Sequence, residues 1–185
     1  MSVPDWSDRP RDLASALLLR GTNLKEVIVL KKQKGFTLIE LLIVVAIIGI
    51  IADIAIPNLL NAIDRGKQKR TMADLRSVGA AVEEYAIDNS FYPNVASESD
   101  IAGSALETSV EPIYIRNVPV EDGWGWNMRY VSDTTMYTVG SLAKDGSAGG
   151  SLTLDGTGGQ MTDFDCDIIF SGGSFIQWPE GTQSD

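Results

Sequence analysis

The first half of the chain contains one long apolar run. Residues 36–60 are apolar except at four positions, Thr37, Glu40, Asp53 and Asn58. About 20 residues at a rise of 1.5 Å per residue cover the hydrocarbon core of a bilayer, so this run is long enough to cross a membrane as a helix. Glu40 is costly within it, since an acidic residue at membrane depth costs roughly 2.5–3.5 kcal/mol.

A helical pattern continues beyond the apolar run, over residues 61–90. Apolar residues there recur every three or four positions and mark one face, which includes Leu75, Val78 and Val82. The pattern therefore predicts a single helix from residue 36 to about residue 89, about 80 Å long at 1.5 Å per residue.

Pro57 is the predicted weak point of this helix. Proline removes a backbone donor and clashes with the preceding turn, so we expect a kink or local melting there. Gly49 and Gly66 are two further weak points, because glycine lowers helix stability.

Residues 91–185 predict a small sheet. Two strands, near Met128–Ser132 and Met136–Leu142, flank a turn, and a second hairpin over residues 167–178 turns at the glycine pair 172–173. The intervening segment, 143–167, is rich in Gly and Asp and predicts a long loop. The fold class is therefore α+β, with a long N-terminal helix, transmembrane in its first half, packed on a small antiparallel β-sheet.

Composition narrows the function. The 185 residues include no His and a single cysteine, Cys166, so imidazole chemistry is absent. The sequence also lacks a Gly-rich phosphate loop and a GxSxG motif, and we expect no enzyme. Residues 36–185 carry eight Lys/Arg against twenty-one Asp/Glu, and such an acidic domain argues against nucleic-acid binding.

Basic residues on the flanks of the apolar run predict its orientation. Lys31, Lys32 and Lys34 precede it, which predicts a cytoplasmic N-terminus and a C-terminal domain across the membrane. Four basic residues between positions 65 and 70 reduce this asymmetry.

The junction between the lysines and the apolar run resembles the processing motif of type IV pilins and of the pseudopilins of type II secretion. It consists of Lys34-Gly35-Phe36 with Glu40 four residues further on, then about twenty apolar residues and Pro57. The resemblance implies a leader peptide over residues 1–35, cleavage after Gly35 by the prepilin peptidase, and N-methylation of Phe36.

Cleavage would give Glu40 a partner. Phe36 and Glu40 lie one turn apart on a helix, so the new cationic amine, of the same chain or of a neighbour, can neutralise the carboxylate. Removing one member of a buried pair costs roughly 3–5 kcal/mol. Glu40 would thus set the register of an assembling filament, and the resemblance makes Pro57 part of the same assembly helix, 36–60, which residues 61–90 continue.

Residues 118–150 are similar to the core of major pseudopilins, and the paired cysteines common in pilins are absent. The resemblance implies the major pseudopilin of a type II secretion system, which polymerises to drive protein export across the outer membrane. Two alternatives stay open: the major pilin of a type IV pilus for adhesion or motility, and a membrane-anchored envelope binding protein. The matching positions are Pro119, Asp122, Trp124, Gly125, Tyr137, Ser141, Leu142, Asp145, Gly146, Gly149 and Gly150.

The resemblance also implies the partners and the location. The partners would be other copies of the chain in a homopolymeric filament, minor pseudopilins, the prepilin peptidase, and the inner-membrane assembly platform with its ATPase. The chain would span the bacterial inner membrane once, with residues 91–185 as a periplasmic domain and the filament in the periplasm or at the cell surface.

In major pseudopilins the loop after the second strand binds calcium, an ion that takes six to eight oxygen ligands in a flexible loop. The resemblance carries over Asp145, with Ser141 and the Leu142 carbonyl beside it. Asp155 is the nearest candidate for the second acidic ligand. Its alternatives are Asp163, Asp165 and Asp167.

Overall fold

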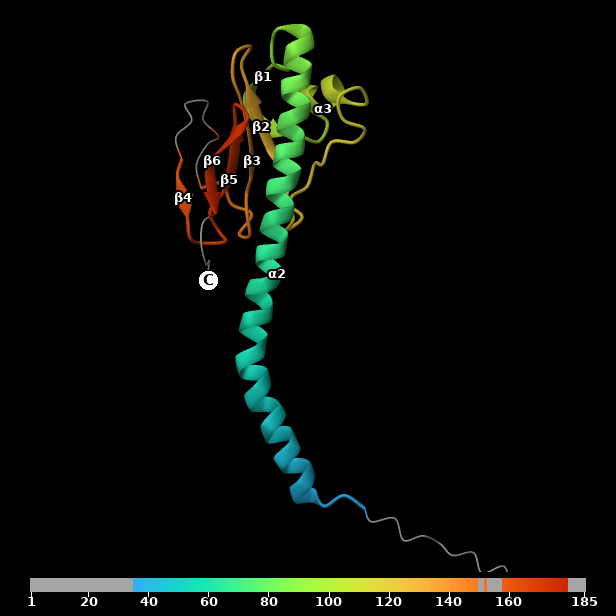
Figure 1. The fold of residues 1–185 in the computed structure, drawn as a ribbon, viewed down its shortest axis with the longest axis vertical. Coiled ribbons are helices and arrows are strands. Elements are labelled where there is room, and N and C mark those ends of the chain that lie inside the picture. The colour runs from blue at the N-terminus through green and yellow to red at the C-terminus, as the bar shows by residue number, and fades with distance from the viewer. Residues whose placement is uncertain (1–34, 150–151, 153–157, 180–185) are drawn as a thin grey trace, which may run out of the picture. The chain divides into compact units, whose positions relative to one another are not determined.

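A computed structural model describes residues 35–149, 152 and 158–179 of the chain. The dominant element is helix α2, Leu38–Asn89, which has 52 residues (Figure 1). Its extent agrees with the helix predicted from the apolar pattern, which ends at the polar residues before Pro93. The helix is continuous through Pro57, so the local melting expected there does not occur. One proline removes a single hydrogen bond, and the turns on either side keep theirs.

Six strands form the sheet, in the spatial order β1-β2-β3-β5-β6-β4. Every neighbouring pair is antiparallel except β4 and β6, which are parallel, so the sheet is mixed rather than purely antiparallel. The strands are β1 (Val95–Asp100), β2 (Arg129–Ser132), β3 (Tyr137–Ser141), β4 (Gln160–Met161), β5 (Ile168–Ser171) and β6 (Ser174–Pro179).

Both predicted hairpins are present. Strands β2 and β3 pair from Arg129 opposite Gly140 to Ser132 opposite Tyr137. Strands β5 and β6 turn at Gly172 and Gly173, whose φ angles of 55° and 82° lie in the left-handed region that glycine reaches without strain.

Three elements were not expected from the sequence: β1, β4 and the short helix α3, Ala105–Val110. Strand β1 is rich in Ser, Glu and Asp, residues that are uncommon in strands. It is nevertheless held at the sheet edge against β2, where Asp100 lies opposite Arg129. Ser104 caps the N-terminus of α3, and its hydroxyl accepts a hydrogen bond from the Glu107 amide.

The hydrophobic core lies between the second half of α2 and the sheet. The helix contributes Leu75, Val78 and Val82, all 0% exposed, and the sheet contributes residues such as Val139 and Phe170. The predicted helical face of residues 61–90 is therefore the face that packs on the domain. This packing confirms the α+β fold class.

Candidate functional site

The N-terminus of α2 carries the predicted processing motif. Phe36 is 83% exposed, and a side chain at Gly35 would meet nothing within 4 Å. A peptide bond between two residues so free of packing is open to a peptidase. The structure therefore leaves the expected cleavage point clear on this part of the chain.

Glu40 has a partner that the sequence analysis missed. One of its carboxylate oxygens, Oε2, accepts hydrogen bonds from the Thr37 amide at 2.9 Å and from the Thr37 hydroxyl at 2.7 Å. In return the Glu40 amide donates to Thr37 Oγ1 at 3.3 Å. This reciprocal arrangement is a capping box, which satisfies helix-end donors with side chains, and the T-x-x-E spacing could have predicted it.

Beyond Glu40 the helix exposes its large apolar side chains. Ile39, Leu42, Ile50 and Ile54 are each 62–70% exposed, and none of them is covered by the residues that the structure describes. Among the described residues, α2 is the one helix long and apolar enough to cross a membrane. Its first half therefore needs lipid or other apolar helices around it, since bare apolar patches of this size mark an interaction surface.

The predicted cation ligands next to β3 lie in two different environments. The Ser141 hydroxyl donates to Asp122 Oδ2 at 2.6 Å and accepts from the Ala143 amide at 3.1 Å, so it is engaged within the protein. Asp145 is exposed, and its Oδ1 accepts from the Ser147 amide at 2.9 Å. The Asp145 carboxylate retains oxygen lone pairs for a further ligand.

Asp167 is the most unusual of the predicted acids. It is 7% exposed, and its Oδ1 is buried without a hydrogen-bond partner. Its Oδ2 accepts from the Gly149 amide at 2.8 Å. Burial raises the pKa of this carboxyl above the ordinary value, despite the Gly149 hydrogen bond, and the negative charges of Asp145 and Glu98 raise it further.

The other predicted acids are less suited to a buried ligand. Asp163 and Asp165 are both exposed, and Asp163 Oδ1 accepts from the Asp165 amide at 3.1 Å in a local turn. Asp155 lies outside the described residues. Within the described part of the chain, no three acids, cysteines or histidines gather closely enough to hold a metal by themselves, so a cation there would need backbone carbonyls such as that of Leu142.

A buried polar contact joins α2 to the start of this loop. Asp64 is 8% exposed on the helix; its Oδ1 accepts from Trp124 Nε1 at 3.2 Å and its Oδ2 lies 3.4 Å from Lys144 Nζ. Two turns further along, the Thr71 hydroxyl accepts from the Gly123 amide at 2.8 Å. Sequence reasoning did not find this contact, because its members lie far apart in the chain.

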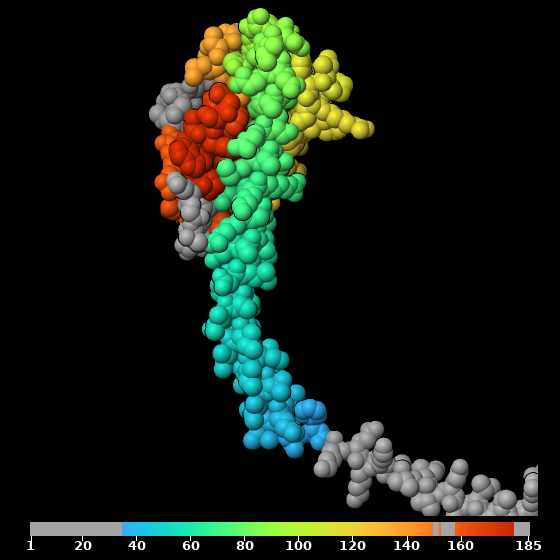
Figure 2. Space-filling view, in the orientation of Figure 1, coloured from blue at the N-terminus to red at the C-terminus, as the bar shows by residue number. Residues whose placement is uncertain are grey.

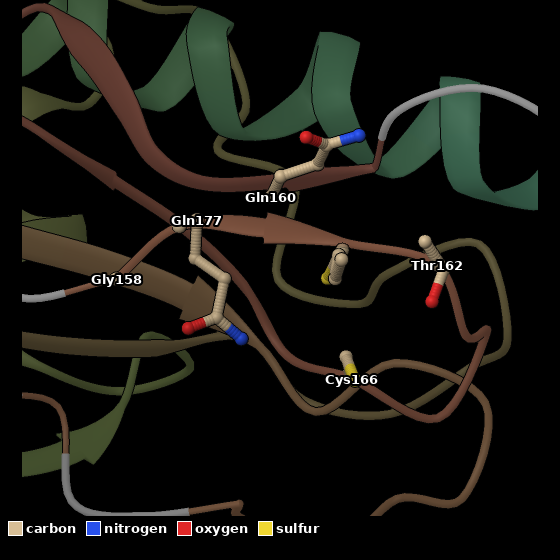
Figure 3. A pocket seen from close by; sticks show the side chains of 7 residues that line it. Gly158, Gln160, Thr162, Cys166 and Gln177 are labelled. Carbon is tan, nitrogen blue, oxygen red and sulfur yellow. The ribbon is translucent and has the colours of Figure 1, made fainter.

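An open pocket lies beside β4 and Cys166, and Figure 3 shows Thr162, Cys166 and Gln177 among its lining residues. Gln177 Nε2 donates to the Asp167 carbonyl at 2.7 Å. Burial raises the pKa of the Cys166 thiol, and the charges of four nearby aspartates, Asp163 foremost, raise it further. The thiol is therefore a weak nucleophile at neutral pH.

Comparisons with known proteins agree with these features. The model of the prokaryotic N-terminal methylation motif matches residues 30–52, and that of type II secretion system protein G matches residues 58–155. Type II secretion system core protein G of Vibrio cholerae is 34% identical over 140 residues, which cover 71% of this chain and 92% of the relative.

The proteins of the same name from Pseudomonas aeruginosa and Escherichia coli K12 are 31% and 30% identical. They align over 65% and 64% of this chain and over 90% and 86% of their own lengths. No solved structure is significantly similar to the chain. The matched ranges contain the processing motif, the second half of α2 and the first hairpin, and the chain belongs to the protein G family of type II secretion systems.

Proposed function

We propose that the chain is the major pseudopilin of a type II secretion system, a structural subunit that polymerises to drive protein export. The observation that carries this proposal is the N-terminus of α2. There an accessible Gly35–Phe36 bond, a capped Glu40 and an apolar helix without protein cover follow one another. These three features are what a subunit needs to be cut, anchored and then bundled with other helices.

The location and orientation follow from the same segment. Before assembly, α2 holds the chain in the inner membrane, with the lysines before Gly35 in the cytoplasm. The domain after residue 90 lies in the periplasm. During assembly the helices leave the lipid and pack against one another, so that apolar side chains exchange one apolar environment for another.

The partners are proposed from the family. Copies of the chain form the filament, minor pseudopilins join it, and the prepilin peptidase prepares each subunit. The inner-membrane assembly platform and its ATPase supply the work. The exposed apolar residues of α2 support the contact between copies, because they require other apolar helices once the lipid is left behind.

Replacing Glu40 tests this function. In Glu40→Ala the cleavage site and the apolar helix are unchanged, so we expect normal processing and membrane insertion. Assembly should fall strongly, because the amine of Phe36 would then enter the helix bundle without a counter-charge, at a cost of roughly 3–5 kcal/mol per subunit.

The measurements are mass spectrometry of the mature N-terminus and electron microscopy of sheared filaments. The wild-type chain should begin with N-methyl-Phe36, and Glu40→Asp is the control that keeps the charge. A wild-type chain that forms filaments while keeping residues 1–35 would contradict the proposal. A normal filament yield from Glu40→Ala would also contradict it.

We further propose that the loop after β3 binds calcium through Asp145 and Asp167. Asp167 Oδ1 is a buried oxygen in need of a partner, and a second acid, Asp145, raises its pKa. A divalent cation would neutralise both charges and supply the missing contact. The Leu142 carbonyl is the predicted backbone ligand, whereas the Ser141 hydroxyl is engaged by Asp122.

A further inference from the structure

The segment of α2 that follows the apolar run is basic in an otherwise acidic part of the chain. Residues 65–70 contain four of the eight Lys/Arg found after residue 36, and no acid. Large apolar side chains continue almost up to this segment, since Ile63 is still 46% exposed. The helix surface therefore changes from apolar to cationic within one turn. The four cations are Arg65, Lys67, Lys69 and Arg70.

These cations surround the side of the helix that the domain leaves open. At 3.6 residues per turn, the other three lie about 40°, 140° and 200° around the helix axis from Arg65. The buried residues of the same stretch, Asp64, Gln68 and Thr71, lie between about 240° and 300°, where the domain packs. Toward its N-terminus α2 leaves the domain as a single uncovered helix (Figure 2). A neighbouring helix would contact one side of this segment, whereas the cations face most of the way around it.

Part of this positive charge is left for an external partner. Arg70 Nε lies 3.5 Å from Asp74 Oδ2, but the Arg70 side chain is 69% exposed. Lys69 is exposed and has no ion pair with another residue that the structure describes. The acid nearest to the segment along the helix, Asp64, is engaged by Lys144 at 3.4 Å.

The position of the cations along α2 suits the headgroup layer of a bilayer. The helix from Leu38 to Ile63 is about 38 Å long at 1.5 Å per residue, and a tilted helix of this length fits a hydrocarbon core of about 30 Å. Helical side chains lean toward the N-terminus, so the cations of residues 65–70 reach back by about one turn toward that core. Lys and Arg can place their stems along apolar surface while their charged ends stay in a polar layer.

We propose that residues 65–70 bind the phosphate groups of anionic phospholipids, in the leaflet on the domain's side of the membrane. The occupant is lipid because the segment directly continues the apolar surface of α2, carries the opposite charge to the phosphates and is open on most sides. The contact offsets the repulsion between the acidic domain and an anionic membrane surface, and it holds the subunit at one depth before assembly. This inference rests on the proposed function, because it requires α2 to span the membrane.

The test places a fluorophore beside the cations in the full-length chain. Gly66→Cys, in a Cys166→Ser background, is the labelling site, because a side chain at Gly66 would meet nothing within 4 Å. The chain is reconstituted into vesicles of phosphatidylcholine and phosphatidylglycerol, in which either lipid carries a spin label that quenches the fluorophore. The local concentration of phosphatidylglycerol should exceed that of phosphatidylcholine about three- to fivefold, since one cation near an anionic surface favours it by up to about fivefold. Salt at about 1 M should remove most of this preference.

Two variants and one control assign the preference to the cations. Lys69→Gln/Arg70→Gln should reduce it to about twofold or less, whereas Lys69→Arg/Arg70→Lys keeps both charges and should preserve it. Arg76→Gln removes an exposed cation of the same helix about 15 Å beyond Gly66, and it should leave the preference unchanged.

The outcomes separate this inference from the proposed function. If neither lipid quenches the fluorophore, α2 does not place this segment at a membrane, and the membrane anchor of the proposed function fails together with the lipid site. Equal quenching by the two lipids overturns the lipid site alone. A Lys69→Gln/Arg70→Gln chain that keeps the lipid preference but forms fewer filaments also overturns it, and assigns the cations to a contact with another copy of the chain.

Discussion

Single residues at helix ends and in turns make hydrogen bonds that stabilise nearby charged groups. Thr37 shows this most clearly, because it supplies the Glu40 carboxylate with two hydrogen bonds in the uncut chain. A carboxylate that accepts hydrogen bonds costs less to transfer from water into an apolar environment than one without hydrogen-bond partners. Under the proposed function, removal of Gly35 would give Glu40 a stronger, charged partner one turn away, the amine of Phe36. The proposed processing would therefore exchange a local partner for one that two copies of the chain can share.

Asp133 plays a comparable part in the turn between β2 and β3. Its Oδ1 accepts from the Thr135 amide at 2.7 Å, the Thr135 hydroxyl at 2.8 Å and the Met136 amide at 2.7 Å. These hydrogen bonds, the Thr135 amide first, lower the pKa of Asp133 below its usual value of 3.8. Folding thus favours the ionised form, and the resulting stability is present above about pH 4 and lost as the pH falls through the lowered pKa.

We therefore expect the unfolding temperature of Asp133→Asn to fall less than that of wild type as the pH is lowered. Its amide oxygen can still accept hydrogen bonds in the turn but does not titrate in this range. Asp133→Ala should instead lower the midpoint of thermal unfolding at every pH, because it removes the side chain that accepts the hydrogen bonds of the turn. Thermal unfolding followed by circular dichroism from about pH 2 to pH 7 distinguishes them. If the unfolding midpoints of wild type and Asp133→Asn depend on pH equally, Asp133 does not contribute to the destabilisation at low pH.

At the scale of elements, the fold depends on how closely α2 approaches the sheet. A Cβ atom at Gly79 would lie 2.2 Å from Cε1 of Phe170, a buried ring of β5. The Tyr137 hydroxyl also donates to the Gly79 carbonyl at 3.4 Å. Gly66, by contrast, has nothing within 4 Å of its Cβ position. Gly79 therefore allows α2 to pack closely on the sheet, whereas Gly66 lies where a side chain has room.

The substitution Gly79→Ala should destabilise the domain by about 1–3 kcal/mol, because the Phe170 ring has to move within a packed core. The matched control is Gly66→Ala, which should raise the stability by about 0.5–1 kcal/mol through helix propensity alone. Urea unfolding of the full chain in detergent measures both. A gain in stability from Gly79→Ala would mean that the helix does not pack so closely on the sheet.

At the scale of the whole molecule, α2 and the acidic loop are coupled. Asp64 on the helix contacts Lys144, whose amide donates to the Phe164 carbonyl at 3.1 Å across the loop. Gly149 and Asp167 close the same loop. We therefore expect neutralisation of the Asp145 and Asp167 charges to stabilise the loop. Because Asp64 contacts Lys144, the same change should also stabilise the contact between the loop and α2.

Calcium is expected to protect segment 143–167 from protease, and a chelator should remove the protection. Asp167→Asn removes a buried charge that folding disfavours, so its loop should be less sensitive to the chelator than the wild-type loop. Asp163→Asn, an exposed acid of the same loop, is the control and should respond as wild type does. Limited proteolysis with mass spectrometry gives the cleavage sites. An unchanged wild-type digestion pattern with chelator would argue against calcium.

The sequence by itself determined the elements whose causes are local. The apolar run, the helical spacing up to residue 89, and the Gly172–Gly173 turn each specify their structure within a few neighbouring residues. The processing motif around Gly35 and Glu40 is local for the same reason. Propensity and turn chemistry act over such distances, and these predictions agreed with the structure wherever it tests them.

Only the tertiary structure decided the rest. Strand β1 has a composition that disfavours strands, and its pairing with β2 some thirty residues later overrides that preference. Asp167 resembles Asp163 and Asp165 in sequence, yet it alone of the three is buried, and its carboxylate accepts a hydrogen bond from the amide of Gly149, 18 residues away in the chain. Burial depends on residues that are distant in the chain, and a single sequence does not record which of them will meet.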